Sequence, residues 1–312
     1  MMRSALCTVT LSCFLYGGHA LGNGMPVPAE VAGTPLFDEE EVLFAAPTRE
    51  DRIGRIVAPV TINGRGPFRL ILDTGANQTV LSTALANELG LAPNLDGGVV
   101  INGVTGSALV PTVRLDSLQT GDLVQRDVDV PVVNSVMGGA HGILGMRGFD
   151  GKRIAVDFGK NEILITNSRG QRAPSYAISI PAKVRFGRLL VVDGRVGRVR
   201  VKAIIDTGGQ RTLGNIALRD ALVRKRSFRH QAIETGVIGL TNEEQAGHEW
   251  QSPAIQLGEA QLRHVPVIYG DIHVFKLWGL ENEPALLIGM DVLGLLRSFV
   301  VDYRREEIQI RP

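Results

Sequence analysis

The sequence is poor in cysteine, aromatic residues and net charge. Its two cysteines, Cys7 and Cys13, both lie among the first twenty of 312 residues. Aromatic residues make up 5% of the chain and glycine occurs 37 times, which suits a β-rich fold with many turns. The formal net charge of +1 excludes a general attraction to nucleic acid or to an anionic membrane. After the first twenty residues no apolar run is long enough to span a bilayer, so we expect no stable membrane insertion.

The first twenty residues resemble a secretory signal peptide. Arg3 supplies a positive start, residues 5–16 are largely apolar, and Gly18-His19-Ala20 provides small residues for cleavage. A mature chain that begins near Leu21 contains no cysteine, which excludes disulfide bonds and thiol catalysis. Export without cysteine suggests a bacterial envelope, so we expect a periplasmic or secreted location.

Several patterns of catalytic and metal-binding residues are absent. The sequence has no Gly-x-Ser-x-Gly pattern and no phosphate-binding loop pattern. Its histidines after the signal peptide show no paired spacing of metal ligands. They are His141, His230, His248, His264 and His273. We therefore expect no metal site and no cofactor.

A repeated Asp-Thr-Gly organises the rest of the chain. The apolar run Leu70-Ile71-Leu72 precedes Asp73-Thr74-Gly75, and Val80-Leu81 follows it. Asp206-Thr207-Gly208 has the same apolar flanks within VKAIIDTGGQRTLGN. A carboxylate between two apolar segments is expensive to bury unless it is hydrogen-bonded or has a function. The pattern predicts a buried strand and then a tight turn at the glycine, once in each copy.

The two copies also match far from the Asp-Thr-Gly. A Gly-Arg pair begins nine residues before each aspartate (73 − 64 = 9 and 206 − 197 = 9). A Gly-Met pair follows after 72 residues in the first copy (145 − 73 = 72) and after 83 in the second (289 − 206 = 83). Ala-Val-Asp-Phe at 155–158 and Val-Val-Asp-Tyr at 300–303 come next. Matching features in one order make an internal repeat whose copies are each long enough to form a lobe.

These residues resemble the retropepsin and pepsin group of aspartic proteases, in a single-chain bacterial type with two Asp-Thr-Gly lobes. The resemblance covers about Ile53 to Ile310 and implies a mainly β, bilobal acid-protease fold. Two pseudo-twofold-related β lobes would each carry a short helix. The expected organisation, in chain order, is a signal peptide (1–20), a linker or pro-segment (21–52), an N-terminal lobe (53–166), a linker (167–177) and a C-terminal lobe (178–312).

Local patterns predict the elements within each lobe. Asn63-Gly64 indicates a hairpin between strands 53–62 and 68–72. Apolar spacing predicts helices over 81–89, with Gly90 as its stop, and over 216–226. We also expect several short strands over 113–133, a turn at Asp193-Gly194 and a short helix within 286–296. Hairpins over 153–166 and 299–310 would close the two lobes.

The resemblance implies a role for each site residue. Asp73 and Asp206 would share a proton and activate a water for peptide hydrolysis. An extended peptide would lie beneath two mobile hairpins, the flaps, and pair its backbone with theirs. One chain with both lobes would act as a monomer. The supporting loop residues are Thr74, Gly75, Thr207 and Gly208, with Thr74 and Thr207 hydrogen-bonded across the interface, and the flap residues are Gly103, Val104, Thr105, Val237, Ile238 and Gly239.

The residue after each Asp-Thr-Gly departs from the family pattern. Ala76 and Gly209 stand where the family has a small or hydroxyl residue, and neither donates a side-chain hydrogen bond to the carboxylates. Such a bond would lower the carboxyl pKa. The departure therefore predicts a pH optimum less acidic than that of a stomach-type enzyme, and Gly209 would make the second loop more permissive.

Two other functions fit parts of the sequence. Asp73 to Thr79 and Asp206 to Thr212 match the Asp-x-Gly-x-x-x-Thr of actin- and Hsp70-like ATPase hairpins. The segments between them lack the long helices of that fold. A retropepsin-like protein that binds peptides without cutting them, or cuts them weakly, would retain the cleft, and Gly209 leaves this alternative open.

Overall fold

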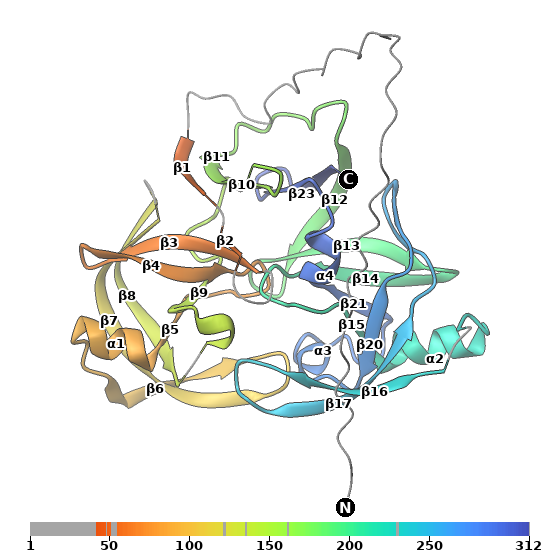
Figure 1. The fold of residues 1–312 in the computed structure, drawn as a ribbon, viewed down its shortest axis with the longest axis horizontal. Coiled ribbons are helices and arrows are strands. Elements are labelled where there is room, and N and C mark those ends of the chain that lie inside the picture. Colours follow the sequence, from red (N-terminus) through yellow and green to blue (C-terminus); the bar gives the residue numbers. More distant parts are fainter. Residues whose placement is uncertain are drawn as a thin grey trace, which may run out of the picture. The chain divides into compact units, whose positions relative to one another are not determined.

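Strands make up most of the regular structure. The computed structural model describes residues 42–47, 49–50, 55–120, 123–134, 136–160, 162–228 and 231–311. These residues form two sheets and a few short helices, which confirms the predicted mainly β fold (Figure 1). The predicted signal peptide, residues 1–20, lies outside the described residues.

The first sheet has eight strands in the described part of the chain. It contains the first Asp-Thr-Gly, at the end of its third strand. In pairing order the strands are β2 (Arg49–Glu50), β3 (Ile56–Ile62), β4 (Arg65–Leu72), β9 (Gly142–Leu144), β5 (Val80–Ser82), β8 (Leu123–Val133), β7 (Ser107–Thr120) and β6 (Asn94–Asn102).

The second sheet has fifteen strands in the described residues and contains the second Asp-Thr-Gly. Its strands β18 (Ile255–Leu257) and β19 (Ala260–Leu262) branch from β13. The others are, in pairing order, β1 (Val42–Pro47), β11 (Glu162–Asn167), β10 (Lys152–Asp157), β22 (Ser298–Asp302), β23 (Glu307–Arg311), β12 (Ile178–Arg185), β13 (Leu189–Val196), β14 (Val199–Ile205), β21 (Ala285–Ile288), β15 (Leu213–Asn215), β20 (Pro266–Gly270), β17 (Glu244–Gln251) and β16 (Ile233–Ile238).

The same strand arrangement surrounds each Asp-Thr-Gly. In the first half, β4 pairs in parallel with β9, β9 pairs antiparallel with β5, and β5 pairs in parallel with β8. In the second half, β14, β21, β15 and β20 pair in the same order and directions. The sequence repeat is therefore also a repeat of the fold, and the predicted bilobal class is confirmed.

Alternating burial explains why the strand segments form sheets. In β14, Val199, Val201 and Ala203 are buried while Arg200 is exposed, so one face contacts the core and the other meets solvent. The last residues of β4 and β14 are buried without alternation, because they run into the interior toward the aspartates.

Two short helices follow the two Asp-Thr-Gly loops, as predicted. Helix α1 (Thr83–Leu89) is capped by the Ser82 hydroxyl, which accepts a hydrogen bond from Leu85 N at 3.2 Å, and it ends at Gly90 with φ of 70°. Helix α2 (Ile216–Arg224) is capped by Asn215. The short helix expected within 286–296 is α4 (Met290–Leu293), whereas α3 (His273–Leu277) was not predicted. A 3-10 turn, η2, covers Met137–Gly139.

Helix α2 ends in exposed basic residues. The residues at the end of α2, 224–226, are exposed, as expected for a solvated basic helix terminus.

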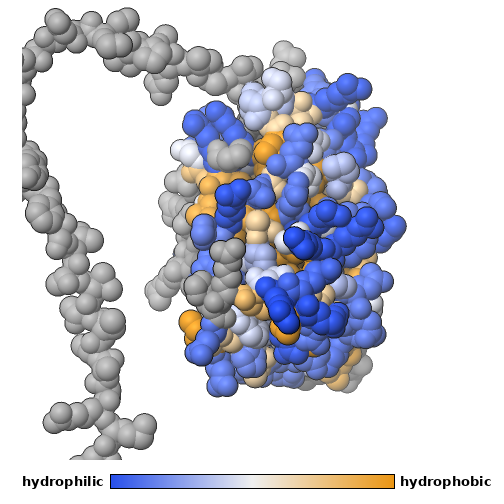
Figure 2. Space-filling view, turned by 90° about the vertical axis from the view of Figure 1, so that its right-hand side faces the viewer, coloured by the Kyte–Doolittle hydropathy of each residue, from blue (hydrophilic) through white to orange (hydrophobic). Residues whose placement is uncertain are grey.

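Figure 2 shows a mostly hydrophilic face with apolar residues scattered across it. No helix in the described ranges is long and apolar enough to cross a membrane.

Two local predictions are wrong. Residues 113–133 were expected to form several short strands, but they belong to two long strands, β7 and β8, which pair along most of their length. Asp193-Gly194 was expected to be a turn but lies within β13, and the chain turns instead at Gly197, whose φ is 55°. Gly194 is needed for a different reason, because a Cβ there would lie 2.7 Å from Leu257 Cδ2 and 2.8 Å from Gln256 O.

The second sheet contains strands from both ends of the chain. β10 and β11, at the end of the predicted N-terminal lobe, pair with β22 and β1 respectively. β1 and β2 fall within residues 21–52, for which the sequence predicts a linker or pro-segment. The boundary between the lobes and the cleavage of a pro-segment therefore remain predictions.

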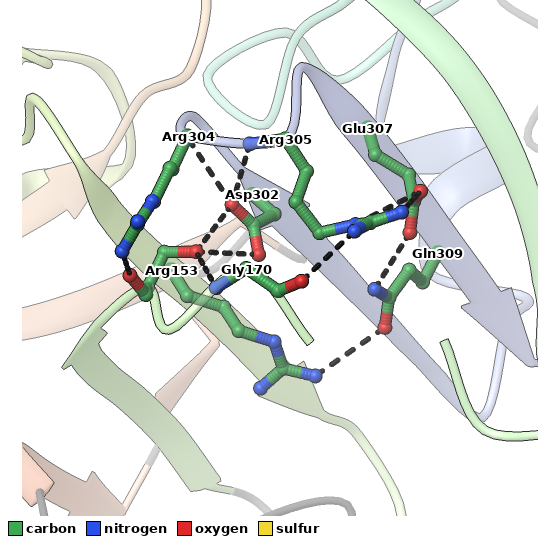
Figure 3. Close-up of polar contacts among 8 residues, drawn as sticks. Arg153, Gly170, Asp302, Arg304, Arg305, Glu307 and Gln309 are labelled. Carbon is green, nitrogen blue, oxygen red and sulfur yellow. Dashed lines mark hydrogen bonds and ion pairs between the residues drawn. The ribbon is translucent and has the colours of Figure 1, made fainter. Parts of the chain in front are cut away.

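A buried polar network holds the segment after β11 against the closing hairpin (Figure 3). The Asp302 carboxylate is 1% exposed and accepts hydrogen bonds from Ser168 Oγ at 2.7 Å and from the amides of Arg304 and Arg305 at 3.1 and 3.0 Å. The Arg304 and Arg305 guanidinium groups donate to the carbonyl oxygens of Ser168 and Gly170, both at 2.9 Å. The backbone that connects the two repeats is therefore anchored by charge-assisted hydrogen bonds.

We expect Gly194→Ala to lower the free energy of unfolding by about 1–3 kcal/mol, because the added methyl group overlaps β18. Thermal denaturation of the purified chain measures the change. Gly103→Ala is the matched control, since its Cβ would have no neighbour closer than 3.4 Å. Equal melting temperatures for the two variants would contradict the close approach of β18 to β13.

Candidate active site

Each aspartate follows the end of a buried strand and is held by the neighbouring apolar strand. Asp73 N donates to Leu144 O at 3.1 Å, and Asp206 N donates to Ile288 O at 3.0 Å. β9 and β21 therefore support the two loops. A Cβ on Gly289 would lie 2.7 Å from the Arg211 carbonyl, so this glycine lets the supporting strand approach the loop.

Two threonines further along the loops have structural hydrogen bonds. Thr79 Oγ1 accepts from Gly145 N at 3.3 Å, and Thr212 Oγ1 accepts from Gly289 N at 3.2 Å. Thr212 also donates to the Asp291 carboxylate at 2.7 Å. The Asp-x-Gly-x-x-x-Thr pattern is thus accounted for by loop support, without a phosphate ligand.

Thr74 and Thr207 join the two loops reciprocally. Thr74 N donates to Thr207 Oγ1 at 3.0 Å, and Thr207 N donates to Thr74 Oγ1 at 3.1 Å. Each hydroxyl then donates onward across the interface, from Thr74 to Ile205 O at 2.8 Å and from Thr207 to Leu72 O at 2.7 Å. All four bonds are buried, so they fix the position of one aspartate relative to the other.

The carboxyl groups of Asp73 and Asp206 lie close together, but their surroundings differ. Asp73 Oδ1 accepts one backbone hydrogen bond, from Gly75 N at 2.7 Å. Asp206 Oδ1 accepts two, from Gly208 N at 2.8 Å and Gly209 N at 3.0 Å. Backbone donors stabilise an ionised carboxylate, so Asp206 holds negative charge more easily than Asp73 does.

The glycines of both motifs leave room for the carboxyl groups. A Cβ on Gly75 would lie 2.7 Å from Asp206 Oδ1, and one on Gly208 would overlap the Asp73 carboxylate. A Cβ on Gly209 would lie 2.8 Å from Asp206 Oδ2. The unusual Gly209 therefore permits close contact between the second loop and its own carboxylate.

Burial raises the pKa of both carboxyl groups. The pKa of Asp73 is raised well above its usual range by burial, and the negative charge of Asp206 raises it further. The pKa of Asp206 is raised by burial and lowered in part by its hydrogen bonds to Asp73, Gly208 and Gly209. The pair therefore retains a proton at a pH where an ordinary aspartate is ionised.

A cleft of ≈ 650 Å³ opens above the two carboxyl groups. Apolar residues from both halves form most of its walls, and the only charged residues that line it, among those described, are Arg55, Asp73, Asp206 and Arg211. Of the sequence-predicted residues, those that line the cleft are Asp73, Gly75, Gly103, Val104, Asp206, Gly208, Val237, Ile238 and Gly239. Thr74 and Thr207 are buried at the interface between the loops, and Thr105 is buried between the flaps.

The predicted flaps are the β6–β7 and β16–β17 hairpins, and their tips touch (Figure 1). Gly239 N donates to Thr105 Oγ1 at 3.1 Å, and Val274 N in α3 donates to Val104 O at 3.1 Å. Val104 packs against the apolar cluster of the second half, around Leu213, and Leu240 packs against the cluster of the first half. Each tip thus contacts the lobe opposite to its own.

Sequence reasoning did not identify Arg55, Asn77 or Trp278 as cleft residues. Asn77 Nδ2 donates to Phe186 O at 2.8 Å, and its Oδ1 accepts from Arg188 N at 2.7 Å, so it links the halves. Trp278 stacks on Phe186 at 5.7 Å between ring centroids. Extending the repeat back from its Gly-Arg pair would have aligned Arg55 with Arg188 (73 − 55 = 18 and 206 − 188 = 18).

The histidines have other contacts. His141 Nδ1 accepts from Arg69 N at 3.0 Å, and His273 Nε2 lies 3.0 Å from Ser107 Oγ. His230 lies outside the described residues. Within the described ranges, no three histidine, cysteine, aspartate or glutamate side chains form a group that would hold a metal ion.

Replacing Thr74 with valine should destabilise the fold. The substitution leaves Thr207 N and Ile205 O buried without their partner, at a cost of about 1–3 kcal/mol for each group. For the two groups together we expect a melting temperature lower by roughly 4–24 °C, taking about 2–4 °C per kcal/mol. Thr74→Ser keeps the hydroxyl and should lose much less. If Thr74→Val melted with the wild type while Thr74→Ser melted lower, the methyl group and not the hydrogen bonds would stabilise the interface.

Replacing Asp73 with asparagine should stabilise the protein at neutral pH. The pKa of Asp73 is higher in the folded protein than in the unfolded chain, so the folded protein keeps this proton to a higher pH. The free energy of unfolding therefore falls as the pH rises from the unfolded-state pKa through the folded-state pKa. Asparagine does not ionise, so the variant avoids this loss of stability. We expect its melting temperature near pH 7 to be higher than that of the wild type by about 2–4 °C, which corresponds to about 1 kcal/mol. The gain should vanish in acid. Melting curves across pH, with exposed Asp116→Asn as control, test this. A lower melting temperature for Asp73→Asn at neutral pH would refute it.

Comparison with known proteins identifies the family. The model of the aspartyl protease family matches residues 58–147 and 192–292, together more than half of the chain. The two matched regions contain the two Asp-Thr-Gly loops and the strands that support them. A search of curated proteins found no match. The reciprocal loops, their repeated strand arrangement and this match lead to one conclusion: the chain belongs to the aspartyl protease family.

Proposed function

We propose that the protein is an aspartic endopeptidase that hydrolyses peptide bonds with a water activated by Asp73 and Asp206. The observation that carries the proposal is the pair of closely spaced carboxyl groups, contributed by equivalent loops of the two halves, at the base of an apolar cleft. Two like charges so close cannot both ionise easily, so the pair supplies one acid and one base. Both are needed to break an amide bond.

We propose a different role for each aspartate, and their unequal surroundings support this. Asp206, with two backbone donors, is the ionised base, and Asp73 holds the proton. Asp206 takes a proton from water as the water oxygen bonds to the carbonyl carbon, and Asp73 gives its proton to the carbonyl oxygen. Asp206 then protonates the leaving nitrogen as the carbon–nitrogen bond breaks. Asp73 recovers a proton from the new hydroxyl, which restores the starting state.

The substrate is a peptide in extended conformation. The cleft runs beneath two hairpins whose backbone groups are available to an added strand. Apolar walls favour apolar side chains on both sides of the cut bond. Because both aspartates belong to one chain, we propose an active monomer. We also propose export to the periplasm or the medium, on the sequence of residues 1–20.

A protein that binds peptides in the same cleft without cutting them is the competing function. The lack of a side-chain hydroxyl after either Asp-Thr-Gly favours it, since Ala76 and Gly209 do not donate to the carboxyl groups through side chains. Gly209 N donates to Asp206 Oδ1 through the backbone, which supports a working pair.

We expect the chain from Leu21 to cut a mixed peptide library, with a maximum rate above about pH 2, the region of stomach-type pairs. The reason is that burial raises the pKa of both carboxyl groups, so the singly ionised pair persists to higher pH. Asp73→Asn and Asp206→Asn should each lower kcat by about 10²–10⁴-fold. Mass spectrometry of the products from about pH 3 to 8 gives the rates and the cut sites.

Asp116→Asn, on an exposed position of β7, is the matched control and should retain full activity. Binding of a labelled peptide without turnover at every pH would support the binding-protein function instead. Unchanged cleavage by both active-site variants would show that the reaction takes place elsewhere.

A further inference from the structure

We propose that Arg55 is a positioning residue for the aspartate pair: it holds the second Asp-Thr-Gly loop and supplies the positive charge that balances the shared negative charge. The inference rests on the proposed peptidase function. It gives a role to a side chain that precedes β3 and lies far in sequence from both Asp-Thr-Gly motifs.

The geometry places the Arg55 guanidinium group beside the pair. The residue is 5% exposed, and its side chain lines the base of the cleft together with Asp73 and Asp206. Arg55 Nη1 donates to Gly208 O at 3.4 Å, on the loop that carries the two amide donors to Asp206. A guanidinium group is always charged and is costly to bury without an anion nearby. The shared charge of the pair provides one.

The electrostatic effect of Arg55 reaches both carboxyl groups. Its charge lowers the pKa of Asp73 and of Asp206, and so offsets part of the increase that burial causes. Without a nearby positive charge, ionisation of a buried pair is more costly. Arg55 therefore makes the singly ionised pair accessible at a lower pH than burial alone would allow.

Two other described side chains near the pair differ from Arg55. Arg211 also lines the cleft, but its guanidinium pairs with Glu249 and lies 3.7 Å from the Asp291 carboxylate. Burial raises the pKa of Tyr303, after β22, and the nearby charge of Asp73 raises it further, so the Tyr303 hydroxyl is neutral over the working pH range. Arg55 is thus the cation whose effect is shared by the two carboxyl groups.

The internal repeat supplies a matched control. Arg188 occupies the equivalent position, eighteen residues before Asp206 (206 − 188 = 18). Its guanidinium forms an ion pair with Asp150, and its side chain is 33% exposed. Its backbone amide donates to Asn77. The two arginines therefore share a place in the repeat and a reach across the interface. In the described structure Arg55 contacts the opposite Asp-Thr-Gly loop through its guanidinium group, whereas Arg188 contacts Asn77 through its backbone amide.

The first experiment measures kcat and KM for a library-derived peptide across pH, for Arg55→Gln, Arg55→Lys and Arg188→Gln. We expect Arg55→Gln to lower kcat at least tenfold, with a smaller change in KM, and to move the rate profile to higher pH. Arg55→Lys keeps a charge and should restore the wild-type profile in part. Arg188→Gln should leave the profile in place. A profile unmoved by Arg55→Gln, or moved equally by Arg188→Gln, would overturn the inference.

A second measurement does not depend on activity. The difference in melting temperature between wild type and Arg55→Gln should be largest near neutral pH and shrink in acid, where the carboxyl groups gain protons. The loss caused by Arg55→Gln should also be smaller in an Asp73→Asn background, because the two residues interact. A difference in melting temperature that is the same at every pH and in both backgrounds would show that Arg55 contributes packing alone, whether or not the wild type cuts peptides. A silent wild type with a pH-dependent difference would refute the peptidase function but retain the role of Arg55 at the pair.

Discussion

The carboxyl groups of Asp73 and Asp206 lie against each other where the halves of the chain meet. Their negative charges would repel each other, and the surrounding structure offsets this repulsion. The reciprocal hydrogen bonds of Thr74 and Thr207 hold the two loops together against it. Backbone amides from the glycine loops stabilise negative charge, and the absence of side chains at Gly75 and Gly208 makes the close approach possible. β9 and β21 hold the loops from behind, so the halves of the fold are built around this one contact.

Sequence patterns were sufficient wherever one local rule dominates. The Asp-Thr-Gly repeat, the Asn63-Gly64 turn and the helix stop at Gly90 were predicted because turn and cap residues act within a few positions. Asp193-Gly194 was wrongly predicted to be a turn. The glycine is needed because β18 packs closely against it, and β18 comes close only in the folded sheet. Arg55 was missed since one arginine before a strand has no local pattern, and its contact with Gly208 spans 153 positions.

The two halves repeat the same architecture but provide different environments. Gly209 N donates to Asp206, whereas Ala76 N donates to the backbone oxygen of Asp73. Thr212 hydrogen-bonds to Asp291, whereas Arg147 occupies the position equivalent to Asp291 in the first half (145 + 2 = 147 and 289 + 2 = 291). Two identical subunits would impose the same surroundings on both carboxyl groups. A single chain permits the surroundings to differ, and here they favour one location for the shared proton.

The exchanged contacts of the flap tips have a consequence for entry to the cleft. Val104 is seated in the cluster of the second half and Leu240 in that of the first, while Thr105 and Gly239 hydrogen-bond to each other. Raising one hairpin therefore exposes apolar surface in both halves and breaks a bond that the other hairpin shares. The free energies of opening the two flaps are not independent, so the gate opens as one cooperative unit. For the proposed peptidase, entry of a peptide would then depend on both hairpins together and not on either one alone.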